Sequence, residues 1–347
     1  MNQTDIFQTG SPHISLSEET FSRFSPKNHS SERLRIISEI TTATTIKHIA
    51  GYEIESVHQL AGGATHAVFH LKCRGAEDLV LRATTPEMAW CFHGYNFWQP
   101  QLSRLKIAVP SVIEVNTTCA DFPYPFMLSE YIPGQDFSVV YNDLDIKELQ
   151  GIAEQVVKIQ HTVTGLQRHQ GYGSVSSYSD PGYYPTWFEV ITNLFDEYAK
   201  SSDSILSTND VKALELFILK LYGYYNEIPT DAFLPDVTIK NVIIERGNPV
   251  AICDVDEMGF GDLLITFGQT KALLAKHGLN PIYFDKLIEI FCPDEVQLLA
   301  IEAYSALFCS KFMRSLTAPK TNQDDAARLE SLNRLSAQFR RSTSEIK

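Results

Sequence analysis

Two acidic residues and one amide stand in a spacing that neither a helix face nor a strand face would select. Asp236 and Asn241 are five positions apart, and Asp254 follows two short apolar runs at 242–244 and 250–252. Turn-forming Gly, Asn and Pro residues separate the two runs. This pattern predicts a loop, a β-hairpin and a second acidic loop, which together bring two carboxylates and one amide close to one another.

Two loop carboxylates and an amide are the groups that phosphoryl transfer from a nucleotide requires. One Asp orients and deprotonates the acceptor hydroxyl, while an Asn and a second Asp hold Mg²⁺ on the phosphates. A capped turn is the alternative, because Asp and Asn are common loop residues. A structural cation site at 254–257 is a further alternative, although the EF-hand order of Asp, Gly and Glu is missing.

The segment resembles the catalytic region of the aminoglycoside phosphotransferase family, which reads roughly H-G-D-x-x-x-x-N, a hairpin, I-D-W/F and then G-D. Asp236 and Asn241 match the first part, Asp254 falls at the second acidic position, and Gly261-Asp262 matches the trailing pair. Leu234-Pro235 departs from the pattern, because it replaces the His-Gly that braces the loop in the family. The layout is similar to that of the hygromycin-B-type kinases.

The resemblance, which covers roughly residues 50 to 315, implies an α+β, bilobal protein-kinase-like fold. A small antiparallel β-sheet lobe would join a larger, mainly helical lobe. The implied activity is that of an ATP-dependent (or GTP-dependent) small-molecule kinase acting on the hydroxyl of an antibiotic or a metabolite. Asp236 would be the catalytic base, and Asn241 and Asp254 would hold Mg²⁺.

Nucleotide-binding residues are expected in the first part of the chain. Gly62 and Gly63 interrupt two strand-like runs, where glycines would let backbone N–H groups approach phosphate oxygens, although a plain turn explains the same residues. Arg82 occupies the strand position where kinases keep a phosphate-binding lysine, and arginine binds phosphate bidentately. Glu130 and Ile132 lie in a run that resembles the family's hinge, where backbone groups would pair with the adenine edge.

A catalytically inactive, kinase-fold binding protein is the alternative function. Leu234-Pro235 favours it, as does the lack of an evident helical Glu partner for Arg82. A protein kinase is disfavoured, because no D-F-G and no A-P-E segment follow Asp254.

Other residues near the motif receive secondary roles. Asp256 and Glu257 are expected to be solvated loop charges, with substrate-facing acids as the alternative. Asp262 is expected to anchor its loop rather than do chemistry. Substrate contacts are expected from an aromatic cluster in the helical part, which comprises Tyr172, Tyr183, Tyr184 and Trp187.

Hydrophobic periodicity divides the chain into four parts: an N-terminal arm and helix at 1–49, a small nucleotide-binding lobe at 50–132, a helical catalytic and substrate lobe at 133–318, and a polar tail at 319–347. Five strands are expected in the small lobe. Helices are expected at 145–163, 186–200, 209–226, 268–276, 281–291 and 294–316.

Composition limits the partners. The 347 residues carry a net charge of −13, which argues against a nucleic-acid binder and suits a small, polar, hydroxylated and cationic substrate. The six cysteines are scattered, without C-x-x-C pairs or histidines at zinc-ligand spacing. A secretory start and an apolar run of membrane-span length are both missing. We therefore expect a cytoplasmic protein without a membrane partner, either monomeric or dimeric.

Overall fold

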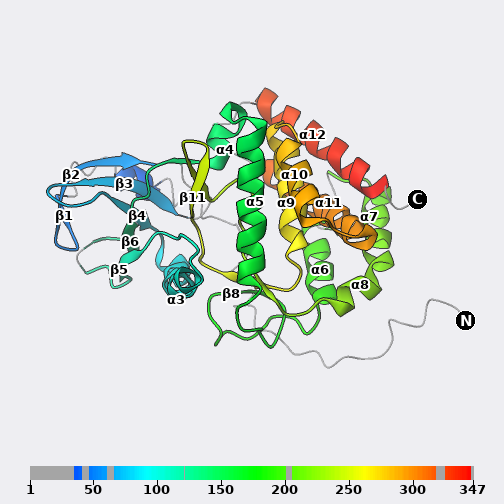
Figure 1. Ribbon diagram of the computed structural model, residues 1–347, viewed down its shortest axis with the longest axis horizontal. Coiled ribbons are helices and arrows are strands. Elements are labelled where there is room, and N and C mark those ends of the chain that lie inside the picture. Colours follow the sequence, from blue (N-terminus) through cyan, green and yellow to red (C-terminus); the bar gives the residue numbers. More distant parts are fainter. Residues whose placement is uncertain are drawn as a thin grey trace, which may run out of the picture.

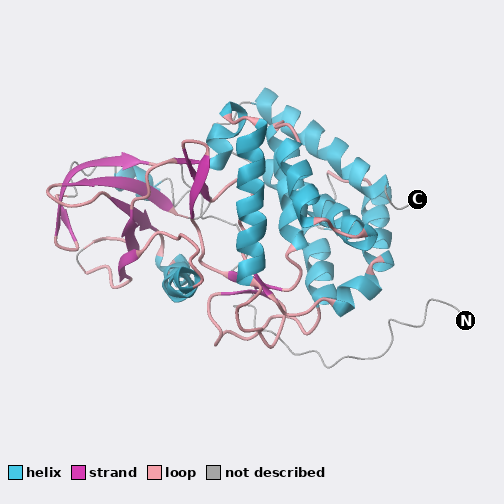
Figure 2. Cartoon of the chain, viewed as in Figure 1, coloured by secondary structure: helices cyan, strands magenta, loops and turns pink. Residues whose placement is uncertain are grey.

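The protein is described by a computed structural model over residues 35–40, 47–60, 66–120, 122–200, 205–317 and 325–344. A β-rich lobe lies at one end of the molecule and a helical lobe at the other (Figure 1). Strands dominate the first lobe and helices the second, with only short strands near the junction (Figure 2). The predicted bilobal α+β architecture is confirmed.

The small lobe is built on one antiparallel sheet with the strand order β1-β2-β3-β4-β6-β5. Its strands are β1 (His48–Ile49), β2 (Tyr52–Gln59), β3 (Ala67–Cys73), β4 (Leu79–Ala83), β5 (Val112–Asn116) and β6 (Phe126–Glu130). Alternating apolar residues such as Phe69, Leu71 and Leu81 are fully buried and form the core of this lobe. The sheet has six strands rather than the five predicted, because His48–Ile49, expected to end a helix, pairs with β2 at the edge.

Helix α3 (Trp90–Arg104), preceded by the short η1 (Pro86–Met88), lies between β4 and β5 in the chain but packs against the large lobe. Phe92, Tyr95, Trp98 and Leu102 are buried in the core of the large lobe rather than in that of the small lobe. The indole N–H of Trp98 also donates to the carbonyl of Val175, 3.0 Å away. Helix α3 is thereby held against the large lobe along its length.

The large lobe is mainly helical, as predicted. Its helices are α4 (Phe137–Val140), η2 (Tyr141–Asp143), α5 (Ile146–Val163), α6 (Trp187–Phe195), η3 (Asp196–Lys200), α7 (Thr208–Lys220), α8 (Tyr222–Glu227), α9 (Leu264–His277), α10 (Ile282–Phe291), α11 (Glu295–Thr317) and α12 (Asp325–Ser344). The single helix predicted at 209–226 is in fact two helices, interrupted at Leu221. Helix α11 is long and apolar enough to cross a membrane, but 61% of its most apolar window is buried, as in the core helix of a soluble protein.

Two small sheets at the junction position the acidic loops. One has the order β11-β10-β7 and the other β8-β12-β9. Their strands are β7 (Gln135–Asp136), β8 (Gly173–Val175), β9 (Ala232–Phe233), β10 (Val242–Glu245), β11 (Asn248–Ile252) and β12 (Met258–Phe260). The predicted hairpin is β10–β11, and its turn has positive φ at both Arg246 and Gly247. The motif residues therefore lie in the loops β9–β10 and β11–β12.

Candidate functional site

The loop that carries Asp236 is braced by a glutamine from α5. Gln160, 1% exposed, donates through Nε2 to the carbonyl of Leu234 at 2.8 Å, and its Oε1 accepts from the Leu234 N–H at 2.9 Å. Leu234 itself is buried. Because both backbone groups of Leu234 are satisfied, the loop keeps a defined start although Leu234-Pro235 stands where the resembling family has His-Gly.

Asp236 follows this brace and opens to solvent. Its carboxylate accepts a hydrogen bond from Gln269 Nε2 at 3.2 Å. Surrounding protein, and then the negative charge of Asp254, raise the pKa of the Asp236 carboxyl above its ordinary value. A carboxylate with a raised pKa is a better proton acceptor than an ordinary one.

Asn241 and Asp254 are brought together by backbone contacts. Asn241 Nδ2 donates to the Asp236 carbonyl at 3.2 Å, and the Cys253 N–H donates to the Asn241 carbonyl at 2.8 Å. Asn241 N–H in turn donates to Asp136 Oδ2 at 3.0 Å. The φ angles of Asn241 and Asp254 are 64° and 62°, in the left-handed region that few residues other than Gly, Asn and Asp enter. Backbone of this kind is concentrated at functional sites.

Arg82, on β4, is joined to both acidic residues of the second loop. Its guanidinium lies 2.5 Å from Asp254 Oδ1 and 3.2 Å from Asp256 Oδ1. Burial acts to lower the pKa of Arg82, but Asp256 and Asp254 outweigh it and raise that pKa, so the side chain stays charged. Burial likewise acts to raise the pKa of Asp254, but Arg82 and His66 outweigh it and hold that pKa below its ordinary value.

Asp256 and Glu257 are not the solvated loop charges that were predicted. The Asp256 side chain is 13% exposed and contacts His66 Nε2 at 3.3 Å as well as Arg82. Burial, followed by repulsion from Asp236 and the neighbouring carboxylates, raises the pKa of Glu257 to about 7. Sequence reasoning missed Asp256 as the acidic partner of Arg82, because the partner was sought on a helix rather than two residues after Asp254.

The remaining predicted residues are the hinge residues Glu130 and Ile132, the glycine pair and Asp262. The Glu130 N–H donates to the Ser111 carbonyl at 2.9 Å, whereas the N–H of Ile132 makes no hydrogen bond to a described residue. Gly62 and Gly63 lie outside the described residues. Asp262 anchors its loop as predicted, because it is buried and accepts from Leu264 N–H and from the hydroxyls of Tyr224 and Tyr304.

The aromatic cluster has a structural role in part. Trp187 is 2% exposed and donates through Nε1 to the Tyr304 hydroxyl, so its prediction as a substrate contact was wrong. The Tyr172 hydroxyl donates to the Ile228 carbonyl at 2.6 Å. Tyr183 and Tyr184 are half-buried. Indole rings are most often buried for packing. The spacing of the aromatic residues in the sequence did not distinguish a ring that packs in the core from a ring that contacts a substrate.

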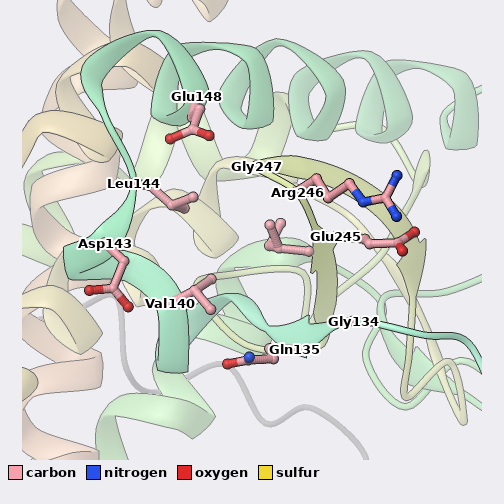
Figure 3. A pocket seen from close by; sticks show the side chains of 10 residues that line it. Gly134, Gln135, Val140, Asp143, Leu144, Glu148, Glu245, Arg246 and Gly247 are labelled. Carbon is pink, nitrogen blue, oxygen red and sulfur yellow. The ribbon is translucent and has the colours of Figure 1, made fainter.

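A separate cavity of about 370 Å³ lies between β7, α5 and the tip of the β10–β11 hairpin (Figure 3). Glu148, Glu245 and Arg246 are among the side chains that line it. None of the predicted catalytic, metal-binding or nucleotide-binding residues lines this cavity. The site is therefore defined by the convergence of the acidic loops and β4, and not by this cavity.

Comparison with known proteins identifies the fold. No protein-family model matches the chain. A curated "Probable ketoamine kinase" from Klebsiella aerogenes is 33% identical over 95 residues, which span 27% of this chain and 32% of that relative. The match therefore covers about a third of the relative's length.

Solved structures match over nearly the whole chain. One is a thermostable mutant of aminoglycoside phosphotransferase APH(4)-Ia in complex with AMP-PNP and hygromycin B, which is 16% identical, covers 91% of this chain and 100% of that chain, and has a TM-score of 0.63. Another is the GDP and kanamycin complex of APH(2″)-IIIa, which is 13% identical, covers 87% and 99% of the two chains, and has a TM-score of 0.63. The chain thus has the aminoglycoside phosphotransferase-like kinase fold, as the resemblance implied.

Proposed function

We propose that this protein, which has the fold of the aminoglycoside phosphotransferases, is a small-molecule kinase that transfers the γ-phosphoryl group of ATP or GTP to a substrate hydroxyl. The observation that carries the proposal is the pair of hydrogen bonds that holds the two acidic loops together. It sets Asn241 beside Cys253-Asp254 and ties the Asn241 side chain to the backbone of Asp236. These three residues match the base and the two metal ligands of phosphoryl transfer from a nucleotide.

The opposite pKa shifts of two carboxylates suit different roles, one as the general base and the other as a metal ligand. Asp236, whose pKa is raised, would accept the proton of the substrate hydroxyl and orient its oxygen. Asp254, whose pKa is lowered, stays ionised and would bind Mg²⁺ together with the Asn241 amide oxygen. When bound, Mg²⁺ supplies charge neutralisation at the phosphates.

The donor set fits a hard divalent cation. Asp236, Asp254, Asp256 and Glu257 lie close enough to influence one another's ionisation, and Arg82 is the cation that contacts two of them. Burial, followed by repulsion from these neighbouring carboxylates, raises the pKa of Glu257. Oxygen ligands and uncompensated negative charge favour Mg²⁺ over softer ions.

Nucleotide binding is proposed for the side of the site that faces the small lobe. The N–H of Ile132, next to the end of β6, has no partner among the described residues and suits a backbone hydrogen bond to a purine edge. Glu130 would contribute its carbonyl, and Gly62 and Gly63 would cover the phosphates. Arg82 would contact the phosphates from β4. The complexes of similar structures with AMP-PNP and GDP support this role without choosing between ATP and GTP.

An amine-bearing, polyhydroxylated small molecule is the proposed acceptor. The acidic cluster would attract a cation, and the similar proteins are described with hygromycin B, kanamycin and ketoamines. We propose that the protein acts in the cytoplasm, without nucleic-acid or membrane partners, as a monomer or dimer. Antibiotic inactivation and metabolite phosphorylation both fit this chemistry.

A binding protein without turnover is the second candidate, and the Arg82–Asp254 contact is the observation that favours it. That contact occupies one oxygen of the proposed metal ligand and the cation proposed for the phosphates. The two hydrogen bonds from Gln160 to Leu234 favour the active kinase, because they hold the catalytic loop in place of the His-Gly that Leu234-Pro235 replaces.

One experiment separates the two candidates. The purified protein is incubated with Mg²⁺ and ATP or GTP across aminoglycosides, hygromycin B, ketoamines and amino alcohols, and phosphorylated products are sought by mass spectrometry. Asp236→Asn is the matched control. We expect product with the wild type and none above background with the variant. Mg²⁺-dependent nucleotide binding without product on any acceptor class would favour the binding protein.

A further inference from the structure

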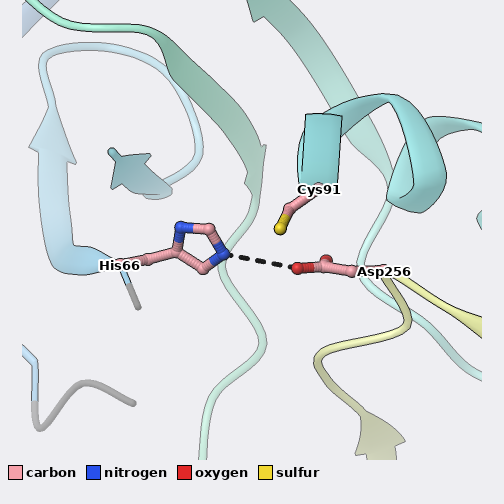
Figure 4. A group of neighbouring side chains, drawn as sticks. All are labelled: His66, Cys91 and Asp256. Carbon is pink, nitrogen blue, oxygen red and sulfur yellow. Dashed lines mark hydrogen bonds and ion pairs between the residues drawn. The ribbon is translucent and has the colours of Figure 1, made fainter. Parts of the chain in front are cut away.

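A histidine, a cysteine and a carboxylate from three separate segments converge at the junction of the two lobes (Figure 4). They are His66, which directly precedes β3, Cys91 in the first turn of α3, and Asp256 in the β11–β12 loop. One potential ligand atom from each residue lies within 4.8 Å of those of the other two. Nothing in the proposed phosphoryl transfer uses His66 or Cys91.

The three side chains are shielded from solvent. His66 and Cys91 are each 5% exposed, and the Asp256 side chain is 13% exposed. The Nδ1 atom of His66 is buried and has no hydrogen-bond partner among the described residues. Solvated loop charges do not explain this buried group, and the His66 nitrogen that faces Cys91 and Asp256 is Nε2, 3.3 Å from Asp256 Oδ2 (Figure 4).

Packing of α3 holds the cluster in place. A Cβ atom at Gly94 would lie 2.0 Å from the Asp256 carbonyl oxygen, so the helix presses directly against the loop. The His66 ring also packs against Phe92, with 5.3 Å between ring centroids. Only glycine at position 94 permits this approach, which fixes the distance between Cys91 and Asp256.

We propose that His66, Cys91 and Asp256 form a zinc site that joins the small lobe, α3 and the large lobe. Imidazole, thiolate and carboxylate are the three ligand types that zinc takes in proteins. In tetrahedral zinc sites the ligand atoms are about 3.5 Å apart. His66 Nε2 and Asp256 Oδ2 already lie 3.3 Å apart, so the other separations, none above 4.8 Å, shorten by about 1 Å at most on binding. A water molecule or the second oxygen of Asp256 completes the coordination.

Charge balance supports a divalent ion at this position. Arg82 contacts both Asp254 and Asp256, which leaves one net negative charge on this group. Binding takes the thiol proton from Cys91, and the doubly charged ion then neutralises the thiolate and the remaining charge. The nitrogen and sulfur ligands distinguish this site from the oxygen-only set of Asn241 and Asp254, and select zinc over magnesium.

The test uses the full-length protein, first stripped of metal with a chelator and then titrated with zinc alone. We expect one tightly bound zinc per chain, unaffected by excess Mg²⁺, and a higher melting temperature with zinc than without. Cys91→Ser and His66→Gln should each weaken zinc binding at least about tenfold, since even residues that only support metal ligands contribute that much. Cys292→Ser, which removes an exposed thiol elsewhere, should leave the affinity unchanged.

Cobalt substitution in the wild type provides a measurement that needs no variant to fold. A thiolate-to-cobalt charge-transfer band is expected in the near ultraviolet, and it should disappear in Cys91→Ser. Absence of the band in the wild type, absence of stoichiometric zinc, or unchanged zinc affinity in Cys91→Ser would each overturn the proposal. None of these measurements depends on kinase activity, so the zinc site and the proposed function fail independently.

Discussion

Asp236 and Asp254 are two carboxylates of one site in opposite electrostatic environments. Asp254 is joined to the Arg82 guanidinium, and its pKa is held below the ordinary value. Asp236 accepts a hydrogen bond only from the neutral Gln269 side chain among the described residues, and its pKa is raised. Surrounding protein penalises charge at both positions, so the guanidinium contact decides the difference.

The difference in pKa indicates which carboxylate suits metal binding and which suits proton transfer. A metal ligand must be ionised at all working pH values, whereas a general base must hold a proton transiently. When neighbouring carboxylates have pKa values shifted in opposite directions, acid–base and charge-stabilising roles can be assigned to them. Arg82 therefore matters for Asp254 as much as for the phosphates that the sequence assigned to it.

The largest expected effect is at Asp236. Asp236→Asn keeps the shape of the side chain but removes the base, so turnover should fall by about 10²–10⁴-fold. Nucleotide affinity, measured by calorimetry in the presence of Mg²⁺, should change little. Turnover comparable to that of the wild type would show that Asp236 is only a loop residue.

Asp254→Ala tests the other half of the comparison. Loss of the charged ligand should weaken Mg²⁺-dependent nucleotide binding by about 10²–10³-fold, since a metal-bound carboxylate contributes several kcal/mol. Binding measured in EDTA should be affected far less. Asp256→Ala, which removes a carboxylate from Arg82 but not the proposed Mg²⁺ ligand, should give a smaller loss. If the two variants exchange these phenotypes, the assignment of the metal ligand is wrong.

The Arg82 guanidinium sets the difference between the environments of Asp236 and Asp254. Without it, the pKa of Asp254 should rise, as that of Asp236 does. Arg82→Ala should raise the nucleotide KM and lower kcat together, by about 10–100-fold overall, because it leaves the buried Asp256 and the half-buried Asp254 without their shared cation. Arg82→Lys should retain part of the activity, since lysine keeps the charge but not the planar fork. Exposed Arg74, which pairs with Glu53 and Glu55, is the matched control. Normal kinetics in a folded Arg82→Ala protein would rule out both roles.

An effect on stability is expected at Glu257, whose pKa rises from 4.5 in the unfolded chain to about 7. The folded state keeps this proton over that interval while the unfolded state releases it, so the stability of the folded state decreases as the pH rises from about 4.5 to 7. Glu257→Gln should therefore stabilise the protein by up to about 3 kcal/mol at pH 8 and by almost nothing at pH 4. Thermal melts at both pH values test this, with exposed Glu245→Gln as the control. Equal stabilisation at both pH values would contradict it.

Local sequence patterns determined the elements of this protein. The strand alternation of 67–73 and 79–83, the hairpin at 242–252 and the spacing of Asp236, Asn241 and Asp254 all depend on residues close together in the chain. Such patterns encode backbone preference and the buried face of one element. They were sufficient for the strands, the hairpin and the acidic loops of the candidate site, whereas the bilobal α+β fold was implied by the resemblance of the motif to a known family.

Only the tertiary structure decided which side chains meet. Gln160 donates a hydrogen bond to Leu234, 74 positions away in the chain. Asp256 contacts Arg82 and His66, which are 174 and 190 positions away. The scattered cysteines excluded a zinc motif from spacing alone, yet packing at Gly94 brings Cys91 to the same loop. Contacts of this range depend on how the helices and the sheet pack, which no local periodicity specifies.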